Sequence, residues 1–504
     1  MRLGMLLQMA ADAMGERTAL GSRSGGVTMA ELAERAGRVG TVLAGLPGER
    51  VALVDLNSEA VPLALFGASL ADKPFVPINY RLTDDGLRDL VRRTAPATVI
   101  VGEGIAERLG PIEGIDVLTR QELLDLAVDV DIPLADPYAG DSESIAVLLY
   151  TSGTTGEPKA AVLRHRNLVS YIISTVEFAG ADEDEAAIVS VPPYHIAGIS
   201  SVLSSTYCGR RLVYVETFEP PTWVDEVRSE RVTHAMVVPT MLNRILDVVE
   251  GDGGGLPSLR ALSYGGGPMP LAVIERAMTL LPGVGFVNAY GLTETSSTIA
   301  LLGPDDHRDA FASDDPAVRA RLASVGQPLP SVEVSIRDDL GDPIGPSSRG
   351  EIWVRGEQVS GEYLGRGDDL DDGWFATRDA GHLDGAGYLY VHGRLDDVIV
   401  RGGENLSPGE IETVLVEHPS IESAAVVGIP DTDWGERVVA AVVPVEGATV
   451  GEEALREYVR AQLRSTRTPE RIDIRTELPF NETGKLLRRV LRAELEAKFG
   501  SPMT

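Results

Sequence analysis

Residues 150–165 have the sequence YTSGTTGEPKAAVLRH, in which hydroxyl side chains, two glycines and one lysine stand close together. It follows the apolar run IAVLL of residues 145–149, which predicts a buried strand. Glycine lets a backbone approach a ligand closely, and at a turn between a strand and a helix the hydroxyls, backbone N–H groups and lysine can hold phosphate oxygens. The stretch therefore predicts a polyphosphate site, with a glycine-rich surface turn as the alternative.

The spacing within this loop differs from that of P-loop NTPases. Their loop has the pattern G-x-x-x-x-G-K-[ST], whereas Gly153, Gly156 and Lys159 stand three residues apart and Pro158 precedes the lysine. The P-loop NTPase interpretation is therefore disfavoured.

Length and composition narrow the class of protein further. A chain of 504 residues is too long for one compact core, so two or more domains are expected. Cys208 is the single cysteine, which excludes an intrachain disulfide. The sequence lacks a run of about 18 apolar residues and a secretory signal pattern, so we expect a cytoplasmic protein without a transmembrane segment. A net charge of −31 argues against nucleic acid as a partner.

The pattern of apolar runs predicts an α/β fold. Short β-branched runs alternate with helical segments, which indicates parallel sheets covered on both faces; they are residues 51–56, 97–102, 187–192, 211–216, 234–239, 259–267 and 285–291. From residue 331 apolar and polar residues alternate, which favours an antiparallel sheet or small barrel. We expect a large N-terminal domain, residues 1–394, of parallel α/β subdomains plus a small β-barrel-like subdomain. A smaller C-terminal α+β domain, residues 395–504, should follow.

Seven motifs stand in the order found in one superfamily. They are TSGTTGEPKA (151–160), PPYHIAG (192–198), YGGGPM (264–269), NAYGLTET (288–295), GWFATRDAG (373–381), GRLDDVIVRGGENLSPGEIE (393–412) and NETGKLLRR (481–489). Together they closely resemble the adenylate-forming superfamily of acyl-CoA and aryl-CoA synthetases, peptide-synthetase adenylation domains and beetle luciferases. The resemblance covers essentially the whole chain and implies ATP, Mg²⁺ and coenzyme A as cofactors.

The resemblance also implies a reaction in two steps. A carboxylate is joined to the α-phosphate of ATP as acyl-AMP, and a thiol then attacks the acyl carbon. Lys485 would supply the positive charge that the first step needs, and Glu294 would hold Mg²⁺. Thr293 would face the α-phosphate, and His195 would orient the acid rather than act as a base. The alternatives are a solvated side chain for Lys485, an exposed loop residue for Glu294 and a packed core residue for His195.

Further residues are implied to bind the cofactors. The phosphate loop contributes Thr151, Ser152, Gly153, Thr154, Thr155, Gly156 and Lys159. The adenine side contributes Gly265, Gly266, Gly267, Tyr290 and Gly291. Asp379 and Arg394 would bind the ribose hydroxyls.

In this family the small domain is mobile and rotates between the steps, with Asp396 at the hinge. Arg401, Gly402 and Gly403 would then line a pantetheine tunnel. Trp434 would pack against the CoA arm or anchor the core of the small domain.

A basic segment runs from Arg456 to Lys498, with 11 basic and 7 acidic residues in an otherwise acidic chain. It predicts either a helix with solvated arginines or a contact with an anionic ligand. Within it the sequence RSTRTPER (464–471) departs from many relatives, which carry an aromatic residue and lysines there, so no contact to the CoA phosphates is assigned.

The function predicted from these residues is ATP-dependent acid–CoA ligation. The presumed pocket segments lack lysine and arginine, which favours an apolar monocarboxylic acid. Fatty acids are favoured over aryl acids because they are the larger class. The alternatives are an aryl-acid CoA ligase, an acyl-AMP ligase that loads a carrier protein, a luciferase-like oxygenase and a non-catalytic paralogue. The sequence leaves a homodimer open.

Overall fold

The protein is described by a computed structural model, which covers residues 1–152, 158–402, 404–431, 434–445, 447–463, 465–480 and 486–500. Contacts between Cα atoms divide the chain into two units. Unit 1 comprises Met1–Gly265, Leu271–Val334 and Val354–Phe375, and unit 2 comprises Gly266–Pro270, Ser335–Trp353 and Ala376–Thr504.

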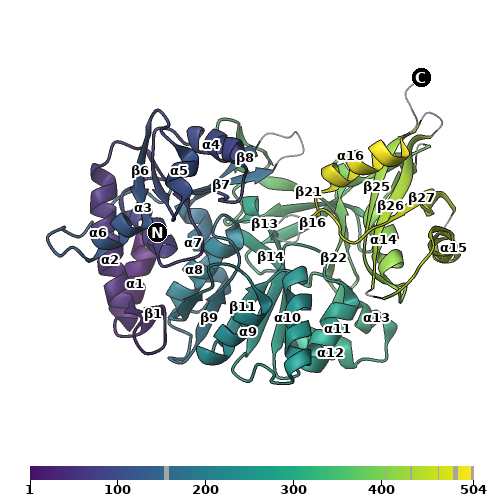
Figure 1. The fold of residues 1–504 in the computed structure, drawn as a ribbon, viewed down its shortest axis with the longest axis horizontal. Coiled ribbons are helices and arrows are strands. Elements are labelled where there is room, and N and C mark those ends of the chain that lie inside the picture. The colour runs from purple at the N-terminus through teal and green to yellow at the C-terminus, as the bar shows by residue number, and fades with distance from the viewer. Residues whose placement is uncertain are drawn as a thin grey trace. The chain divides into compact units, whose positions relative to one another are not determined.

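A nine-stranded sheet carries most of the motifs (Figure 1). Its order is β15 (Gln327–Pro328), β14 (Ser297–Leu302), β13 (Gly285–Leu292), β12 (Ala261–Gly265), β11 (His234–Val237), β9 (Ala186–Val189), β10 (Arg211–Tyr214), β1 (Thr18–Leu20) and β2 (Val27–Thr28). The strands from β13 to β1 in this order run parallel. The prediction of parallel strands from the β-branched runs is confirmed here.

A second sheet of eight strands carries the phosphate loop. Its order is β19 (Gly367–Asp368), β18 (Glu362–Tyr363), β8 (Pro158–Arg164), β7 (Ile145–Ser152), β4 (Phe75–Pro77), β3 (Arg50–Val54), β5 (Ala97–Val101) and β6 (Ile115–Thr119). The strands from β7 to β6 are parallel, whereas β8 and β18 are antiparallel to their neighbours.

A layer of helices supplies one large core shared by the two sheets. It contains α1 (Leu3–Met14), α2 (Met29–Gly45), α3 (Ala60–Leu70), α6 (Arg120–Val128), α7 (His165–Thr175) and α8 (Ile196–Cys208). Ten of the eleven residues of α3 are buried, as expected for a helix that is apolar on every side. The outer helices of unit 1 are α4 (Asp84–Arg92), α5 (Ile105–Leu109), α9 (Pro220–Ser229), α10 (Pro239–Asp252), α11 (Leu271–Leu280), α12 (Pro304–Ala312) and α13 (Pro316–Arg319).

A small sheet occupies the region in which the sequence alternates. Its order is β16 (Glu333–Arg337), β17 (Gly350–Arg355), β21 (Trp374–Leu383) and β20 (Leu370–Asp371), and β22 (Leu389–Arg394) also pairs with β21. β21 is antiparallel to both β20 and β22, in agreement with the predicted small β-rich subdomain.

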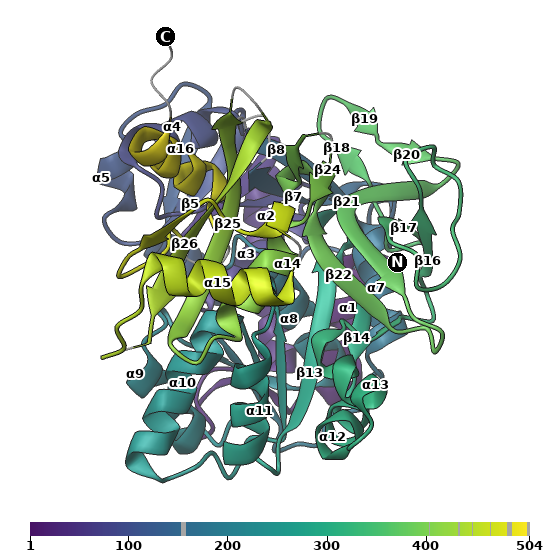
Figure 2. The same ribbon diagram turned by 90° about the vertical axis from the view of Figure 1, so that its right-hand side faces the viewer.

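The last sheet packs helices on both faces (Figure 2). It contains β24 (Glu404–Leu406), β23 (Ile399–Arg401), β26 (Gly435–Pro444), β25 (Ile421–Asp431) and β27 (Arg471–Ile474). Alternate residues of the central pair β25 and β26 pack on α14 (Pro408–Val416) and α15 (Glu452–Gln462), or on α16 (Arg488–Phe499). This two-sided burial explains why residues 424–429 of β25 form a continuous apolar run.

Arg401 and Glu404 are paired across the antiparallel strands β23 and β24. None of the helices in the described part of the chain has the length and apolar composition needed to span a bilayer.

Candidate active site

Several predicted site residues of unit 1 lie at or beyond the carboxyl ends of parallel strands. His195 comes after β9, Gly265 ends β12, and Tyr290 lies near the end of β13. Glu294 comes two residues after β13, in the 3₁₀ helix Thr293–Thr295. Because the carboxyl edge of an α/β sheet is where ligands bind, this shared edge is the candidate active site.

The phosphate loop joins two antiparallel strands, which corrects the prediction that it leads from a strand into a helix. Thr151 on β7 is paired with Lys159 on β8, and α7 begins only after β8. Gly153, Thr154, Thr155 and Gly156 lie outside the described residues, and for Ser152 only the backbone pairing with Pro158 is described.

Lys159 and Glu294 both contact Tyr363. The Lys159 ammonium nitrogen lies 5.6 Å from the centre of the Tyr363 ring, and the Tyr363 hydroxyl donates a hydrogen bond of 2.6 Å to Glu294 Oε1. Glu294 is only 8% exposed. Tyr363 thus connects the predicted phosphate-binding lysine with the predicted metal-binding carboxylate, a role that the sequence analysis missed.

The backbone around Glu294 is fixed by hydrogen bonds from distant residues. Ser360 N–H donates to the Glu294 carbonyl at 2.8 Å, and Gln358 Nε2 donates to the Thr295 carbonyl at 3.0 Å. Gly291 faces this turn so closely that a Cβ atom would lie 1.8 Å from the Ser297 carbonyl oxygen. Gly291 is therefore required by local packing, independently of any nucleotide.

The adenine-side segment serves two different purposes. Tyr264 is fully buried, and its hydroxyl lies 2.8 Å from His307 Nε2, so its side chain belongs to the core rather than to the acid pocket. A Cβ on Gly265 would lie 2.3 Å from the Ala289 carbonyl. Gly266 has a φ of +80°, which favours glycine. A Cβ on Gly267 would meet nothing within 4 Å, so local packing does not require a glycine there.

His195 precedes α8 and is half-buried beside aromatic rings. Its ring lies 4.7 Å from that of Tyr194, which in turn makes an edge contact of 5.7 Å with Tyr80. The Tyr194 ring is buried. This packing holds the imidazole at the carboxyl end of β9, in agreement with an orienting role.

In unit 2, the structure brings Asp379 and Arg394 together. They are paired across β21 and β22, and Arg394 Nη1 lies 3.1 Å from Asp379 Oδ1. Asp379 is 6% exposed, and its N–H donates to Thr377 Oγ1 at 3.1 Å. A buried carboxylate held by a guanidinium is a preorganised acceptor for two hydroxyl donors.

Asp396 lies in the 3₁₀ helix Leu395–Asp397 and is exposed. Its neighbour Asp397 is ion-paired with Arg488 at 3.1 Å, and Arg488 also pairs with Glu412 of α14 at 2.6 Å. Asp397 is therefore linked to α14 and α16 through Arg488, whereas the Asp396 side chain is exposed.

Arg401, Gly402 and Trp434 lie together in unit 2. The Arg401 guanidinium is 5.6 Å from the centre of the Trp434 ring, and Gly402 N–H donates to the Trp434 carbonyl at 2.7 Å. Trp434 is 53% exposed, so the alternative that it anchors the core of the small domain is wrong. Gly403 and Lys485 lie outside the described residues.

The described part of the basic segment is largely neutralised by carboxylates of the same unit. Ion pairs with nearby aspartates or glutamates involve Arg456, Arg467, Arg471, Arg475, Arg488, Arg492 and Lys498. The charges of these side chains are thus compensated within the unit, which argues against a contact with an anionic ligand.

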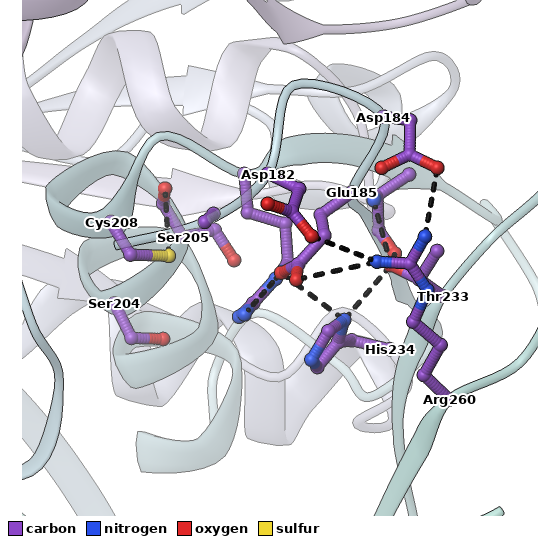
Figure 3. A network of polar contacts seen from close by, with 12 residues as sticks. Asp182, Asp184, Glu185, Ser204, Ser205, Cys208, Thr233, His234 and Arg260 are labelled. Atoms are coloured by element: carbon purple, nitrogen blue, oxygen red, sulfur yellow. Dashed lines mark hydrogen bonds and ion pairs between the residues drawn. The ribbon is translucent and has the colours of Figure 1, made fainter. Parts of the chain in front are cut away.

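A polar network that the sequence analysis did not single out lies at the opposite edge of the nine-stranded sheet (Figure 3). Arg260 Nη2 lies 2.8 Å from Asp184 Oδ2, and Arg210 Nη2 lies 2.8 Å from Glu185 Oε2. Burial and the nearby Arg210 charge lower the pKa of His234 to about 4, so His234 is neutral at pH 7. These residues stand at the amino ends of the strands, away from the carboxyl edge at which ligands bind in α/β sheets.

The residues present fit one magnesium ion shared with substrate. Among the described residues no group of three His, Cys, Asp or Glu side chains could hold a metal. Mg²⁺ in nucleotide sites is bound through one or two carboxylates plus phosphate oxygens and retains waters. Glu294, held by Tyr363, suits that requirement.

Comparison with known families agrees with this arrangement. The profile of the AMP-binding enzyme family matches residues 7–364, and that of the AMP-binding enzyme C-terminal domain matches residues 410–485. The chain belongs to the AMP-binding enzyme family. The predicted superfamily and fold class are thereby confirmed.

Relatives within the AMP-binding enzyme family span nearly the whole chain. A feruloyl-CoA synthase of Amycolatopsis sp is 33% identical over 95% of both chains. A fatty acid–[acyl-carrier-protein] ligase, ScoC, of Streptomyces coeruleorubidus is 32% identical over 92% of this chain and 91% of the relative. The crystal structure of ATP-bound MatB from Rhodopseudomonas palustris has a TM-score of 0.85 at 28% identity and covers 99% of this chain and 100% of that chain. The protein is an AMP-forming acyl-CoA synthetase that uses ATP and CoA.

Proposed function

We propose that the enzyme joins a hydroxylated aryl acid to CoA through an aryl-adenylate, with fatty acids as the second candidate class. The observation that carries this choice is a set of hydroxyls where β14 meets α7 and α8. Ser200 Oγ lies 3.4 Å from Ser297 Oγ, and the Tyr171 hydroxyl lies 3.5 Å from Thr298 Oγ1. Ser200 Oγ donates to the Ile196 carbonyl at 3.0 Å, so it can still accept a hydrogen bond from a hydroxyl on a ring, which a plain alkyl chain cannot donate.

The surrounding charge and a relative support the same choice. The described residues 196–201, 237–241 and 291–299 contain no lysine or arginine, so a second anionic group on the acid would have no partner there. The feruloyl-CoA synthase is named for an aryl acid. The ScoC ligase is named for fatty acids and a carrier protein, which makes carrier loading the alternative second step.

A panel of acids tests the proposal. With ATP, Mg²⁺ and CoA, we expect kcat/KM for hydroxylated cinnamic or benzoic acids to exceed that for C8–C16 fatty acids by about tenfold or more. Pyrophosphate release and the mass of the thioester are the readouts.

Ser200→Ala should lower kcat/KM for the hydroxylated acid by about tenfold and leave kcat/KM for the unsubstituted acid unchanged. Ser204→Ala, on the same helix, is the matched control. Faster turnover of fatty acids would replace the aryl proposal, and adenylate without thioester would indicate a carrier protein.

We further propose that Asp379 and Arg394 bind the ribose, that Glu294 and Thr293 serve the phosphates and Mg²⁺, and that residues 395–504 rotate between the steps about Asp396. The hinge proposal rests on the contrast between the exposed Asp396 and Asp397, which Arg488 ties to the C-terminal sheet.

Asp396→Pro is expected to slow thioester formation by about tenfold or more, with adenylation changed by less than about twofold. Proline fixes φ near −65° and removes the freedom that a hinge requires. Single-turnover measurements of each half-reaction give the two rates, and Asp396→Ala, which retains backbone freedom, should behave as the wild type. Equal slowing of both half-reactions, or of neither, would remove Asp396 from the mechanism.

A further inference from the structure

The backbone just after Glu294 is strained. Two consecutive serines at the start of β14, Ser296 and Ser297, have φ values of +58° and +119°. Residues other than glycine rarely adopt a positive φ, and such conformations persist only where the surrounding structure enforces them. They also cluster at functional sites. Contacts from outside this turn must therefore hold its backbone in place.

One buried side chain bridges the two strained serines. Gln358 is fully buried, and its amide nitrogen donates to the Thr295 carbonyl at 3.0 Å and to the Thr298 carbonyl at 2.8 Å. These two carbonyls flank the serines on either side. The amide oxygen of Gln358 accepts a hydrogen bond of 3.2 Å from the Ser331 hydroxyl. The two N–H groups of one amide thus hold both ends of the strained stretch.

The backbone near Gln358 contacts the same turn. The Ser296 hydroxyl donates to the Gln358 carbonyl at 2.8 Å, and the Ser360 N–H donates to the Glu294 carbonyl at 2.8 Å. Residues 356–361, which connect β17 to β18, therefore bond to three consecutive residues of the turn. The Glu294 backbone and the two residues after it are fixed from this one connecting segment.

The connecting segment is itself anchored to the strands that carry the phosphate loop. The buried Asn167 of α7 donates its amide N–H to the Glu357 carbonyl at 2.8 Å, and the Ser360 hydroxyl donates to the Val162 carbonyl on β8. The next strand, β18, pairs with β8. The turn is therefore held in register with the hairpin from which the phosphate loop extends.

We propose that Gln358 is a positioning residue for adenylation, whose two hydrogen bonds hold the strained turn so that the Glu294 carboxylate stays where it binds Mg²⁺. This role rests on the proposed binding of Mg²⁺ by Glu294. An amide suits the task, because it offers two donors to two carbonyls and carries no charge. Without these bonds the two serines would relax toward negative φ values, and that rotation would displace the neighbouring Glu294.

Gln358→Met tests this role, because methionine has a similar length and offers no hydrogen-bond donor. We expect the Mg²⁺ concentration at half-maximal pyrophosphate release to rise by about tenfold or more, as when other groups that orient a metal ligand are lost. At saturating Mg²⁺ the rate should return to within about threefold of the wild type, because the carboxylate ligand is still present. Thioester formation from a supplied acyl-adenylate should change by less than about twofold.

Ser331→Ala is the matched control for this variant. It removes a hydrogen bond to the same Gln358 side chain and leaves both bonds to the turn in place. We expect its Mg²⁺ midpoint to stay within about twofold of the wild type. Gln358→Asn is a milder second variant, because it keeps an amide in the buried site but is one methylene too short to reach both carbonyls. Its midpoint should rise as well, and thermal unfolding of each variant measures any loss of stability separately.

A parallel titration of Glu294→Gln distinguishes the role of Gln358 from that of Glu294. Higher midpoints for both Gln358 variants, with a normal midpoint for Ser331→Ala, would support the positioning role. Lower stability or a lower rate with an unchanged midpoint would overturn it, as would an equal shift in Ser331→Ala. If Glu294→Gln alone changed the Mg²⁺ dependence, only the positioning role would fail. If neither residue affected it, the binding of Mg²⁺ by Glu294 would fail as well. Every titration uses the same acid, so the comparison is independent of the acid class.

Discussion

Lys485→Ala is expected to lower the rate of adenylate formation by about 10²–10³-fold, with thioester formation from a supplied acyl-adenylate changed by less than about twofold. The adenylation step brings a carboxylate against a triphosphate, so a fixed positive charge between these anions stabilises the transition state. The thioester step begins from a neutral acyl centre after pyrophosphate has left and no longer needs that charge. Pyrophosphate release and single-turnover thioester formation measure the two steps separately.

The control for this variant is another cation of the same unit. Arg489 is exposed in α16, four residues after Lys485, and Arg489→Ala removes the same formal charge from the unit. We expect it to leave both half-reactions within about twofold of the wild type, because an exposed charge is screened by solvent. A Lys485 variant that lost both half-reactions equally would instead show a general requirement for the residue in folding or domain placement.

The fold was predictable where neighbouring residues alone determine the structure. The runs at residues 97–102 and 211–216 were predicted as strands, and they form β5 and β10. A strand that is buried on both faces can be predicted from its apolar, β-branched composition alone. The second strand of the phosphate-loop hairpin was missed. KAAVLR follows the loop with no turn signal of its own, and its strand state depends on pairing with β7 and β18.

Some residues of the candidate site could likewise be predicted from local motifs, whereas others depend on contacts between distant parts of the chain. Asp379 and Arg394 could be chosen as a pair from their motifs, and the antiparallel register of β21 and β22 places them opposite one another. Tyr363 carried no recognisable signal, because its hydrogen bond reaches Glu294 across 69 positions of sequence. Contacts such as Arg488 with Glu412, 76 positions apart, likewise arise only from the packing of α16 against the sheet.

Glu294→Gln is expected to reduce adenylation by about 10²-fold or more and to raise the Mg²⁺ concentration needed for half-maximal rate. Glutamine has the same shape and can still accept the Tyr363 hydrogen bond, so the substitution removes the charge while retaining the packing. A neutral amide is a poor ligand for Mg²⁺, which prefers charged oxygen donors. A magnesium titration of pyrophosphate release measures both effects.

Tyr363→Phe separates the metal-binding role of Glu294 from a purely structural one. Loss of a group that orients a metal ligand typically costs about 10–100-fold in metal affinity or activity. We therefore expect the phenylalanine variant to need more Mg²⁺ and to recover most of its rate at saturating Mg²⁺, since the carboxylate charge is still present. The Glu294→Gln variant should not recover, because no concentration of metal restores the missing ligand. If both variants were slow and insensitive to Mg²⁺, Glu294 would act by holding the turn at β13 and not by binding the ion.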